Sequence, residues 1–296
     1  MNAERNLHDS IKPTHPSESE VSELLEHYQK GSNKPTEMLA RGLTQKYPNH
    51  QLGWKILGIV LRRTRRLEEA LAANLKAVDL LPHDYEAHSN LGTTLKELGR
   101  LYEAEKSYKK ALAIKRDFEQ AHFNLGITLQ ELGKVDEAIT SYQEAIAINS
   151  HYAKAHNNLG ILLQKKRNVK AAESSYRRAI AIEPNYAEAY FNLGNALKEL
   201  GRAKEAELSY KEAIAIQPEF AEAYGNWGNT LRELGRREEA ELTYRKAISI
   251  KPQLQGVQAN LGKLLMEQNQ HKAGLELIRK ACGSVCFDLI NGVQIR

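Results

Sequence analysis

Apolar side chains recur at helical spacing along most of the chain, and residues 187–218 show the pattern clearly. One apolar stripe consists of Tyr190, Leu193, Gly194, Leu197 and Leu200, and a second of Ala203, Ala206, Tyr210, Ala213 and Ile214. Steps of three and four residues place each stripe along one side of an α-helix. Gly201 separates the two stripes and Pro218 follows the second, as is typical of helix ends. The pattern predicts two helices joined by a short turn.

The same pattern returns every 34 residues. A Leu-Gly pair, replaced once by Trp227-Gly228, marks each copy, and its glycines are Gly58, Gly92, Gly126, Gly160, Gly194, Gly228 and Gly262. A fixed period of this length is the signature of a repeat protein built from one recurring structural unit. Seven predicted helical hairpins therefore cover residues 51–288, the last of them degenerate after Gln270.

Small residues and tyrosines indicate how the hairpins pack. One place in the second helix holds Ala70, Ala104, Ala138, Ala172, Ala206, Ala240 and Gly274, and another holds Ala77, Ala111, Ala145, Ala179, Ala213, Ala247 and Ala281. Tyr108, Tyr142, Tyr176, Tyr210 and Tyr244 share a third place and would fill the space between closely approaching helices. A single hairpin cannot bury its apolar stripe, whereas stacked hairpins bury a continuous core. We therefore predict an all-α solenoid.

The two ends of the chain depart from the repeat. Residues 17–50 form a weaker copy of the same length, which we interpret as a divergent amino-terminal capping repeat, because a terminal repeat lacks one neighbour. Residues 1–16 contain Pro13 and Pro16 and are predicted to be a flexible tail. Residues 284–296 place Asn291-Gly292 between β-forming residues, which predicts a short β-hairpin-like segment.

Composition and charge exclude several classes of protein. Among 296 residues, 42% are apolar and only 8 are proline, which excludes a largely disordered or collagen-like protein. No apolar run is long enough to span a membrane, and residues 1–12 lack the apolar stretch of a secretory signal, so we expect a cytoplasmic protein. The net charge of +5 is spread along the sequence rather than gathered in one segment, which disfavours nucleic acid as a partner.

The aromatic, Leu-Gly, alanine, aromatic, alanine and proline positions of each copy resemble the tetratricopeptide repeat family. The resemblance covers about four-fifths of the sequence and implies a right-handed superhelical solenoid of helix-turn-helix hairpins. It also implies that the first helices of the hairpins line a concave groove. The glycine between the two helices is replaced by Arg65, Arg167 and Asn269, so we expect different turns in those three repeats.

No catalytic motif is present in the sequence. It lacks a P-loop, a G-x-S-x-G, an H-E-x-x-H and a G-x-G-x-x-G, so we predict no enzyme activity and no cofactor. His88, His122 and His156 are spaced 34 residues apart at a place that holds tyrosine in later repeats. We therefore expect these histidines to pack at helix starts rather than to bind a metal ion, and we predict no metal site.

Asparagines form the most informative functional pattern. One asparagine precedes the Leu-Gly or Trp-Gly pair in six repeats, and we call this set the asparagine ladder: Asn90, Asn124, Asn158, Asn192, Asn226 and Asn260. Asparagine is unfavourable inside a helix, because its amide competes for backbone hydrogen bonds, so six in register need a reason. In the tetratricopeptide family this place faces the groove, and the ladder resembles that of the repeat domain of O-linked N-acetylglucosamine transferases. That resemblance implies binding of the backbone of an extended peptide.

Further polar residues follow the ladder on the same helix face. They are Asn195 and Asn229, three residues beyond a ladder position, and Lys96, Lys198 and Arg232, six residues beyond one. The cations could bind carboxylates of a partner, or they could pair with neighbouring glutamates such as Glu199 and Glu233. The ladder itself could instead stiffen the solenoid through hydrogen bonds between repeats, and the two roles can coexist.

Three classes of function are compatible with this pattern. We favour a non-catalytic scaffold that binds extended segments of other proteins in the groove of the superhelix. The alternative is the substrate-recognition arm of a glycosyltransferase-like, sulfotransferase-like or oxygenase-like enzyme whose catalytic domain is absent from this chain or separate from it. Nucleic-acid binding is the third and least favoured class. No membrane partner is expected, and a homo-oligomer is compatible with the sequence but not indicated by it.

Overall fold

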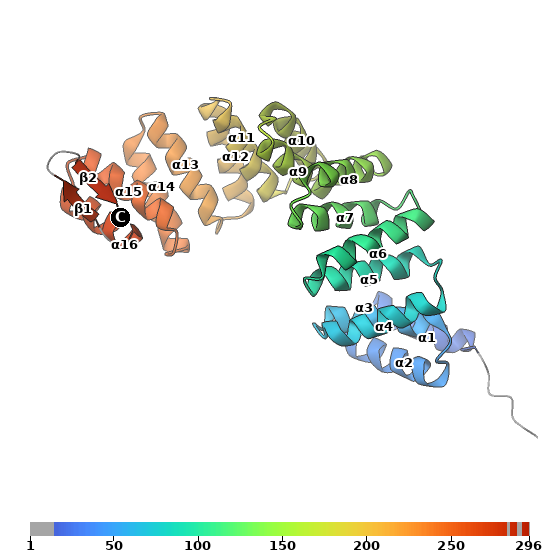
Figure 1. Ribbon diagram of the computed structural model, residues 1–296. Coiled ribbons are helices and arrows are strands. Elements are labelled where there is room, and N and C mark those ends of the chain that lie inside the picture. Colours follow the sequence, from blue (N-terminus) through green and yellow to red (C-terminus); the bar gives the residue numbers. More distant parts are fainter. Residues whose placement is uncertain (1–14, 283–284, 289–291, 296) are drawn as a thin grey trace, which may run out of the picture. The chain divides into compact units, whose positions relative to one another are not determined.

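The computed structural model describes residues 15–282, 285–288 and 292–295. The described residues form sixteen α-helices and two short strands (Figure 1). The helices are α1 Glu18–Gln29, α2 Asn33–Lys46, α3 Gln51–Arg63, α4 Leu67–Leu80, α5 Tyr85–Glu97, α6 Leu101–Ile114, α7 Glu119–Glu131, α8 Val135–Ile148, α9 Ala153–Lys165, α10 Val169–Ile182, α11 Ala187–Glu199, α12 Ala203–Ile216, α13 Ala221–Glu233, α14 Arg237–Ile250, α15 Gln255–Glu267 and α16 His271–Cys282. The repeat architecture of helical hairpins predicted from the 34-residue period is confirmed.

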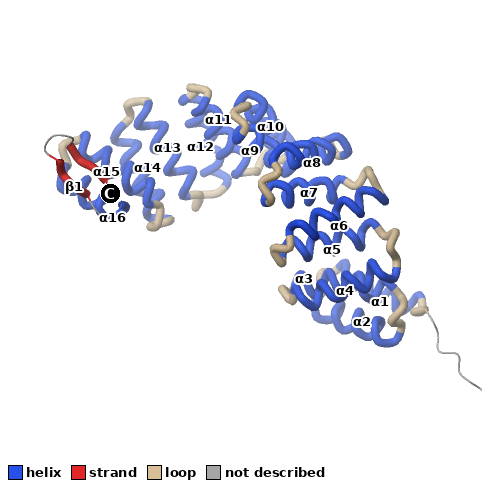
Figure 2. Tube along the Cα trace, in the orientation of Figure 1, coloured by secondary structure: helices blue, strands red, loops and turns tan. Residues whose placement is uncertain are grey.

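The protein divides into two compact units. The amino-terminal unit, Met1–Ile148, contains α1 to α8, and the carboxyl-terminal unit, Asn149–Arg296, contains α9 to α16 and the strands. Within each unit, consecutive helices pack as antiparallel hairpins, and each hairpin packs on the next one in sequence. Figure 2 shows these hairpins in blue with the connecting turns in tan.

The turn between the two helices of a hairpin is the same with and without glycine. Gly201 has a φ of +74°, and Arg65, Arg167 and Asn269 have φ values of +62°, +63° and +63°. The backbone hydrogen bonds also agree: the amides of Arg167 and Gly201 each donate to the carbonyl three residues earlier, at 2.9 Å. Our expectation that these turns differ is therefore wrong, because the hydrogen bonds that end the helix impose a left-handed residue whatever its side group.

Glycine and tyrosine pack together in the five hairpins from α5 to α14. The Tyr210 side chain is fully buried, and a Cβ added to Gly194 would lie 2.6 Å from its Cε1 atom. Tyr142, Tyr176 and Tyr244 lie equally close to the corresponding glycines of their own repeats. The alanine of the second helix, Ala206, is also fully buried. The small residues thus allow the close approach that the sequence predicts.

Two strands follow α16 near the carboxyl end. Strand β1, Val285–Asp288, pairs antiparallel with β2, Gly292–Ile295; both strands are red in Figure 2. In this pairing, Val285 lies opposite Ile295. Residues 289–291 of the predicted hairpin, including Asn291, lie outside the described residues, as do residues 1–14 of the predicted tail. Among the described helices, none combines the length and the apolar character that a membrane span requires.

Candidate functional site

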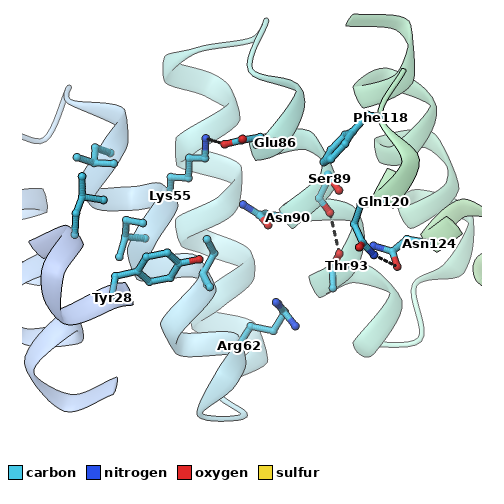
Figure 3. Close-up of a pocket in the computed structure, with 14 residues that line it drawn as sticks. Tyr28, Lys55, Arg62, Glu86, Ser89, Asn90, Thr93, Phe118, Gln120 and Asn124 are labelled. Carbon is cyan, nitrogen blue, oxygen red and sulfur yellow. Dashed lines mark hydrogen bonds and ion pairs between the residues drawn. The ribbon is translucent and has the colours of Figure 1, made fainter. Parts of the chain in front are cut away.

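A groove of about 650 Å³ runs across the first helices of the amino-terminal unit (Figure 3). Its lining residues come from α1, α3, α5 and α7 and from Phe118, which directly precedes α7. They are Leu25, Tyr28, Leu52, Lys55, Ile56, Ile59, Arg62, Glu86, Ser89, Asn90, Thr93, Phe118, Gln120 and Asn124. The hairpin repeat explains this arrangement, since equivalent helices of successive hairpins contribute equivalent faces.

The end of the groove at α1 and α3 is apolar. Leu25 and Tyr28 of α1 lie near Leu52 and Ile56 of α3, and all four belong to one apolar cluster. Ile56 stands at the ladder position of its repeat and is only 4% exposed, and Ile59 follows it by three residues. The ladder therefore does not extend into this repeat, and the groove has an apolar end instead.

The other end of the groove carries amides. Asn90 on α5 and Asn124 on α7, two members of the asparagine ladder, both line it. Gln120 donates its Nε2 hydrogen to Oδ1 of Asn124 at 3.2 Å. The side chain of Asn90 has no hydrogen-bond partner among the described residues, so its acceptor and two donors are available to a ligand.

Charged side chains beside the groove are paired within the protein. Lys55 contacts Oδ2 of Asp84 at 3.0 Å and also Glu86, and Arg62 Nη1 lies 2.8 Å from Glu97 Oε1. Burial alone would raise the pKa of Asp84, but the hydrogen bonds from Lys55 and the Ala87 amide outweigh it and lower the pKa. Lys55 and Arg62 are therefore less available to bind carboxylates of a partner protein than unpaired cations would be.

In the carboxyl-terminal unit, ladder asparagines bond to the preceding repeat. Nδ2 of Asn192 donates to Oδ1 of Asn157 at 3.0 Å. Nδ2 of Asn226 donates to Oδ1 of Asn195, and Nδ2 of Asn260 donates to Oδ1 of Asn229, both at 2.8 Å. Asn158 lies half-buried on α9. Three ladder residues thus make the inter-repeat bonds that the sequence offered as an alternative role.

Buried tyrosines donate hydrogen bonds to the same amide oxygens that accept from Asn226 and Asn260. The hydroxyl of Tyr210 donates to Oδ1 of Asn195 at 2.8 Å, and that of Tyr244 donates to Oδ1 of Asn229 at 2.7 Å. Burial, above all other causes, raises the pKa of Tyr244 to about 12, so its hydroxyl stays a donor at neutral pH. Sequence reasoning treated these tyrosines as packing residues only. The constant spacing of 15 residues between asparagine and tyrosine was the signal available.

The cations on the ladder helices pair with the next repeat. Lys198 Nζ lies 2.9 Å from Glu233 Oε1, and Arg232 Nη2 lies 2.6 Å from Glu267 Oε1. Lys96, at the equivalent place on α5, has no ion-pair partner in the part of the protein that the structure describes. Lys198 and Arg232 therefore pair with glutamates of this protein, which was the second of the two roles considered for them from the sequence.

The repeated histidines make hydrogen bonds near the starts of the first helices. Nε2 of His88 lies 2.9 Å from the carbonyl oxygen of Pro82, and Nε2 of His122 lies equally close to that of Arg116. His156 makes the same contact with Ser150 at 3.2 Å. Within the residues described, no three His, Cys, Asp or Glu side chains are grouped so that they could hold a metal ion.

Stacked helical hairpins with a groove on their first helices define a helical-repeat scaffold, and sequence profiles place it more narrowly. Profiles described as TPR repeat match residues 94–133, 128–166 and 168–201. Profiles described as tetratricopeptide repeat match residues 37–85, 187–220 and 221–254. The chain belongs to the tetratricopeptide repeat family. These profiles do not single out the repeats of O-linked N-acetylglucosamine transferases, and that finer resemblance stays a prediction.

Solved structures show the same fold. A crystal structure of MamA is 28% identical over 55% of this chain and 95% of its own, with a TM-score of 0.53. YrrB, titled a TPR protein with an unusual peptide-binding site, is 24% identical over 68% of this chain and 99% of its own, with a TM-score of 0.56. The APC/C hetero-tetramer Cut9-Hcn1 is 16% identical over 87% of this chain and 48% of that one, with a TM-score of 0.63. No curated protein matches the sequence.

Proposed function

We propose that this protein is a non-catalytic scaffold that binds extended segments of other proteins along the first helices of its hairpins. The observation that carries the proposal is the groove of the amino-terminal unit, where Asn90 and Asn124 stand beside an apolar end. Both features match the parts of an extended peptide. Amides pair with the carbonyl and N–H groups of a peptide backbone, and an apolar recess accepts a side chain.

The two ends of the groove have different tasks in this proposal. Asn90 and Asn124 bind the backbone, which every peptide presents, and therefore contribute affinity with little dependence on sequence. Leu25, Tyr28 and Ile56 surround one apolar side chain of the partner and provide selectivity. Because Lys55 and Arg62 are already paired, we expect binding to weaken only modestly as the salt concentration rises.

The proposal is tested with random linear peptides displayed on phage and selected against the full-length protein. The peptide that is enriched most is then labelled, and its affinity is measured by fluorescence anisotropy. The Asn90→Ala/Asn124→Ala variant loses up to one neutral hydrogen bond at each site, so we expect binding to weaken by about threefold to tenfold per bond.

Asn49→Ala is the matched control, because Asn49 is exposed in the turn before α3 and makes no contact with the groove. Its affinity should equal that of the wild type. Failure to enrich any peptide, or unchanged affinity of a folded Asn90→Ala/Asn124→Ala variant, would show that this groove is not the recognition surface.

A further inference from the structure

In the carboxyl-terminal unit, each of the second helices α10, α12 and α14 has one tyrosine whose hydroxyl donates a hydrogen bond to a polar residue of the first helix of the same hairpin. Tyr210 bonds to Asn195 and Tyr244 to Asn229, whereas Tyr176 donates to Oε1 of Gln164 at 3.0 Å. The amide that accepts this bond is also bonded to the next repeat. Asn226 donates to Asn195, Asn260 donates to Asn229, and Gln164 donates to Glu199. We call these three sets the tyrosine relays.

The relays fix which way the amides face. Oδ1 of Asn195 accepts one hydrogen bond from Tyr210 and one from Asn226, which uses both of its lone pairs. Oδ1 of Asn229 is saturated in the same way by Tyr244 and Asn260. An amide held through its oxygen from two directions cannot flip without breaking both bonds.

Saturating the oxygens leaves other polar groups for a ligand. Nδ2 of Asn195 and of Asn229 has no acceptor among the described residues, and Oδ1 of Asn226 and of Asn260 has no donor there. All four side chains are half-buried on α11, α13 and α15, the equivalents of the helices that line the groove of the amino-terminal unit. The row therefore offers fixed N–H donors and fixed carbonyl acceptors.

Packing alone does not explain the hydroxyls. The ring of Tyr210 fills the space beside Gly194, and a phenylalanine ring would fill it equally well. Burying a hydroxyl costs free energy unless it is hydrogen-bonded, so its presence needs a use beyond volume. Holding a binding group in one orientation is such a use, because preorganised groups lose less entropy when the ligand binds.

We infer that Tyr210 and Tyr244 are positioning residues that orient Asn195, Asn226, Asn229 and Asn260 to bind the backbone amides of an extended peptide. This inference rests on the proposed function and adds to it the class of ligand group for this row, the peptide backbone. Charged side chains of a partner fit less well, because Lys198 and Arg232 on the same helices are paired with Glu233 and Glu267.

The probe for the test is a phage-selected peptide whose binding to the full-length protein is weakened by Asn226→Ala/Asn260→Ala. For that peptide we expect the Tyr210→Phe/Tyr244→Phe variant to bind about threefold to tenfold more weakly, since the amides are no longer held in one orientation. In ¹H–¹⁵N spectra, the side-chain amide signals of Asn195 and Asn229 should move in the same variant.

Tyr108→Phe is the matched control. Its hydroxyl bonds to Thr93, which donates in turn to Ser89 of its own helix, so no ladder amide depends on it. Affinity should be unchanged in this control, and circular dichroism should show that both variants are folded.

Two results would overturn the inference. One is unchanged affinity of Tyr210→Phe/Tyr244→Phe for a peptide that the asparagine pair does weaken, with unmoved amide signals. That result leaves the proposed function standing and reduces the tyrosines to structural residues. The other is that no selected peptide responds to the asparagine pair. The groove of the amino-terminal unit is judged separately, by Asn90 and Asn124.

Discussion

Arg65, Arg167 and Asn269 adopt a left-handed backbone conformation that glycine adopts in the other repeats. An L-residue with a Cβ loses roughly 1–2 kcal/mol in this conformation, although asparagine tolerates it better than arginine. The backbone hydrogen bonds of the turn keep the conformation despite that cost. Arg65 gains a partial compensation, because its guanidinium lies 3.4 Å from Glu97, whereas Arg167 is exposed.

Arg167→Gly should therefore stabilise the protein. We expect the free energy of unfolding to rise by about 0.5–1 kcal/mol, which is the relief of left-handed strain less the greater entropy of glycine in the unfolded state. Urea denaturation followed by circular dichroism measures the change. Lys165→Gly, at the last residue of α9, should instead destabilise, by up to the ~1 kcal/mol that glycine costs in a helix interior. A stability loss in both variants would contradict the strain argument.

At the residue scale the sequence located the polar positions but not their partners. The 34-residue period identified the asparagine ladder, because aligning the repeats places an asparagine at the same helix position in six of them. The bond from Asn226 to Asn195 depends on side-chain rotamers and on the distance between α11 and α13, which the period does not encode. For the same reason, sequence reasoning assigned Tyr210 to packing and missed its hydroxyl.

At the scale of elements, a mostly buried glutamate of the second helix joins successive hairpins. Glu207 on α12 contacts Lys211 of its own helix at 2.7 Å and Arg236, just before α14, also at 2.7 Å. Glu173 joins Arg177 and Arg202 in the same way, and Glu105 joins Lys109 and Lys134. Burial alone would raise the pKa of Glu207, but the hydrogen bonds from Lys211 and Arg236 outweigh it and lower the pKa.

Glu207→Gln should weaken the junction between α12 and α14. We expect a loss of about 1–2 kcal/mol in the free energy of unfolding at neutral pH, because a nearly buried carboxylate with two cationic partners is removed. Glu212→Gln is the control, since Glu212 is exposed and has no ion-pair partner among the described residues; its effect should stay within about 0.5 kcal/mol.

The pH dependence of the same variant gives a second measurement. The pKa of Glu207 is lower in the folded state, so its stabilisation is complete above the unfolded-state pKa near 4.5 and disappears as pH falls through the lower folded-state value. The difference in stability between wild type and Glu207→Gln should therefore shrink as pH drops below about 4.5. A difference that stays constant across this range would exclude a role for the ionised carboxylate.

Whole helices were predictable where whole side-chain networks were not. The apolar stripes and the recurring tyrosine and alanine positions predict the hairpins. The prediction is strong because repeats with different sequences share the same 34-residue pattern. The turns at Arg65 and Arg167 were the exception. The sequence prediction considered only whether glycine was present, whereas backbone hydrogen bonds determine the conformation of these turns. At the two ends of the sequence, where no neighbour repeats the pattern, only short local signals such as Asn291-Gly292 were available.

At the scale of the molecule, each of the two compact units has its own apolar core. In the amino-terminal unit, a cluster around Leu24, Leu57 and Val60 joins the first two hairpins. In the carboxyl-terminal unit, one cluster contains Tyr176 and Tyr210, and another contains Tyr244 and Leu264. Within a repeat array, stability is approximately a sum over hairpins and the interfaces between neighbouring hairpins. A unit with several complete hairpins therefore contains most of what its own folding requires.

The carboxyl-terminal unit, residues 149–296, should consequently fold when it is expressed alone. We expect a helical circular dichroism spectrum and a cooperative urea transition, because α9 to α16 form four complete hairpins around those two clusters. A fragment that begins at Asn168 is the matched comparison. It lacks α9, which is the partner of α10 in its hairpin, and so leaves Ala172 and Tyr176 without part of their packing. That fragment should unfold at a lower urea concentration, and equal midpoints for the two fragments would contradict the hairpin as the unit of stability.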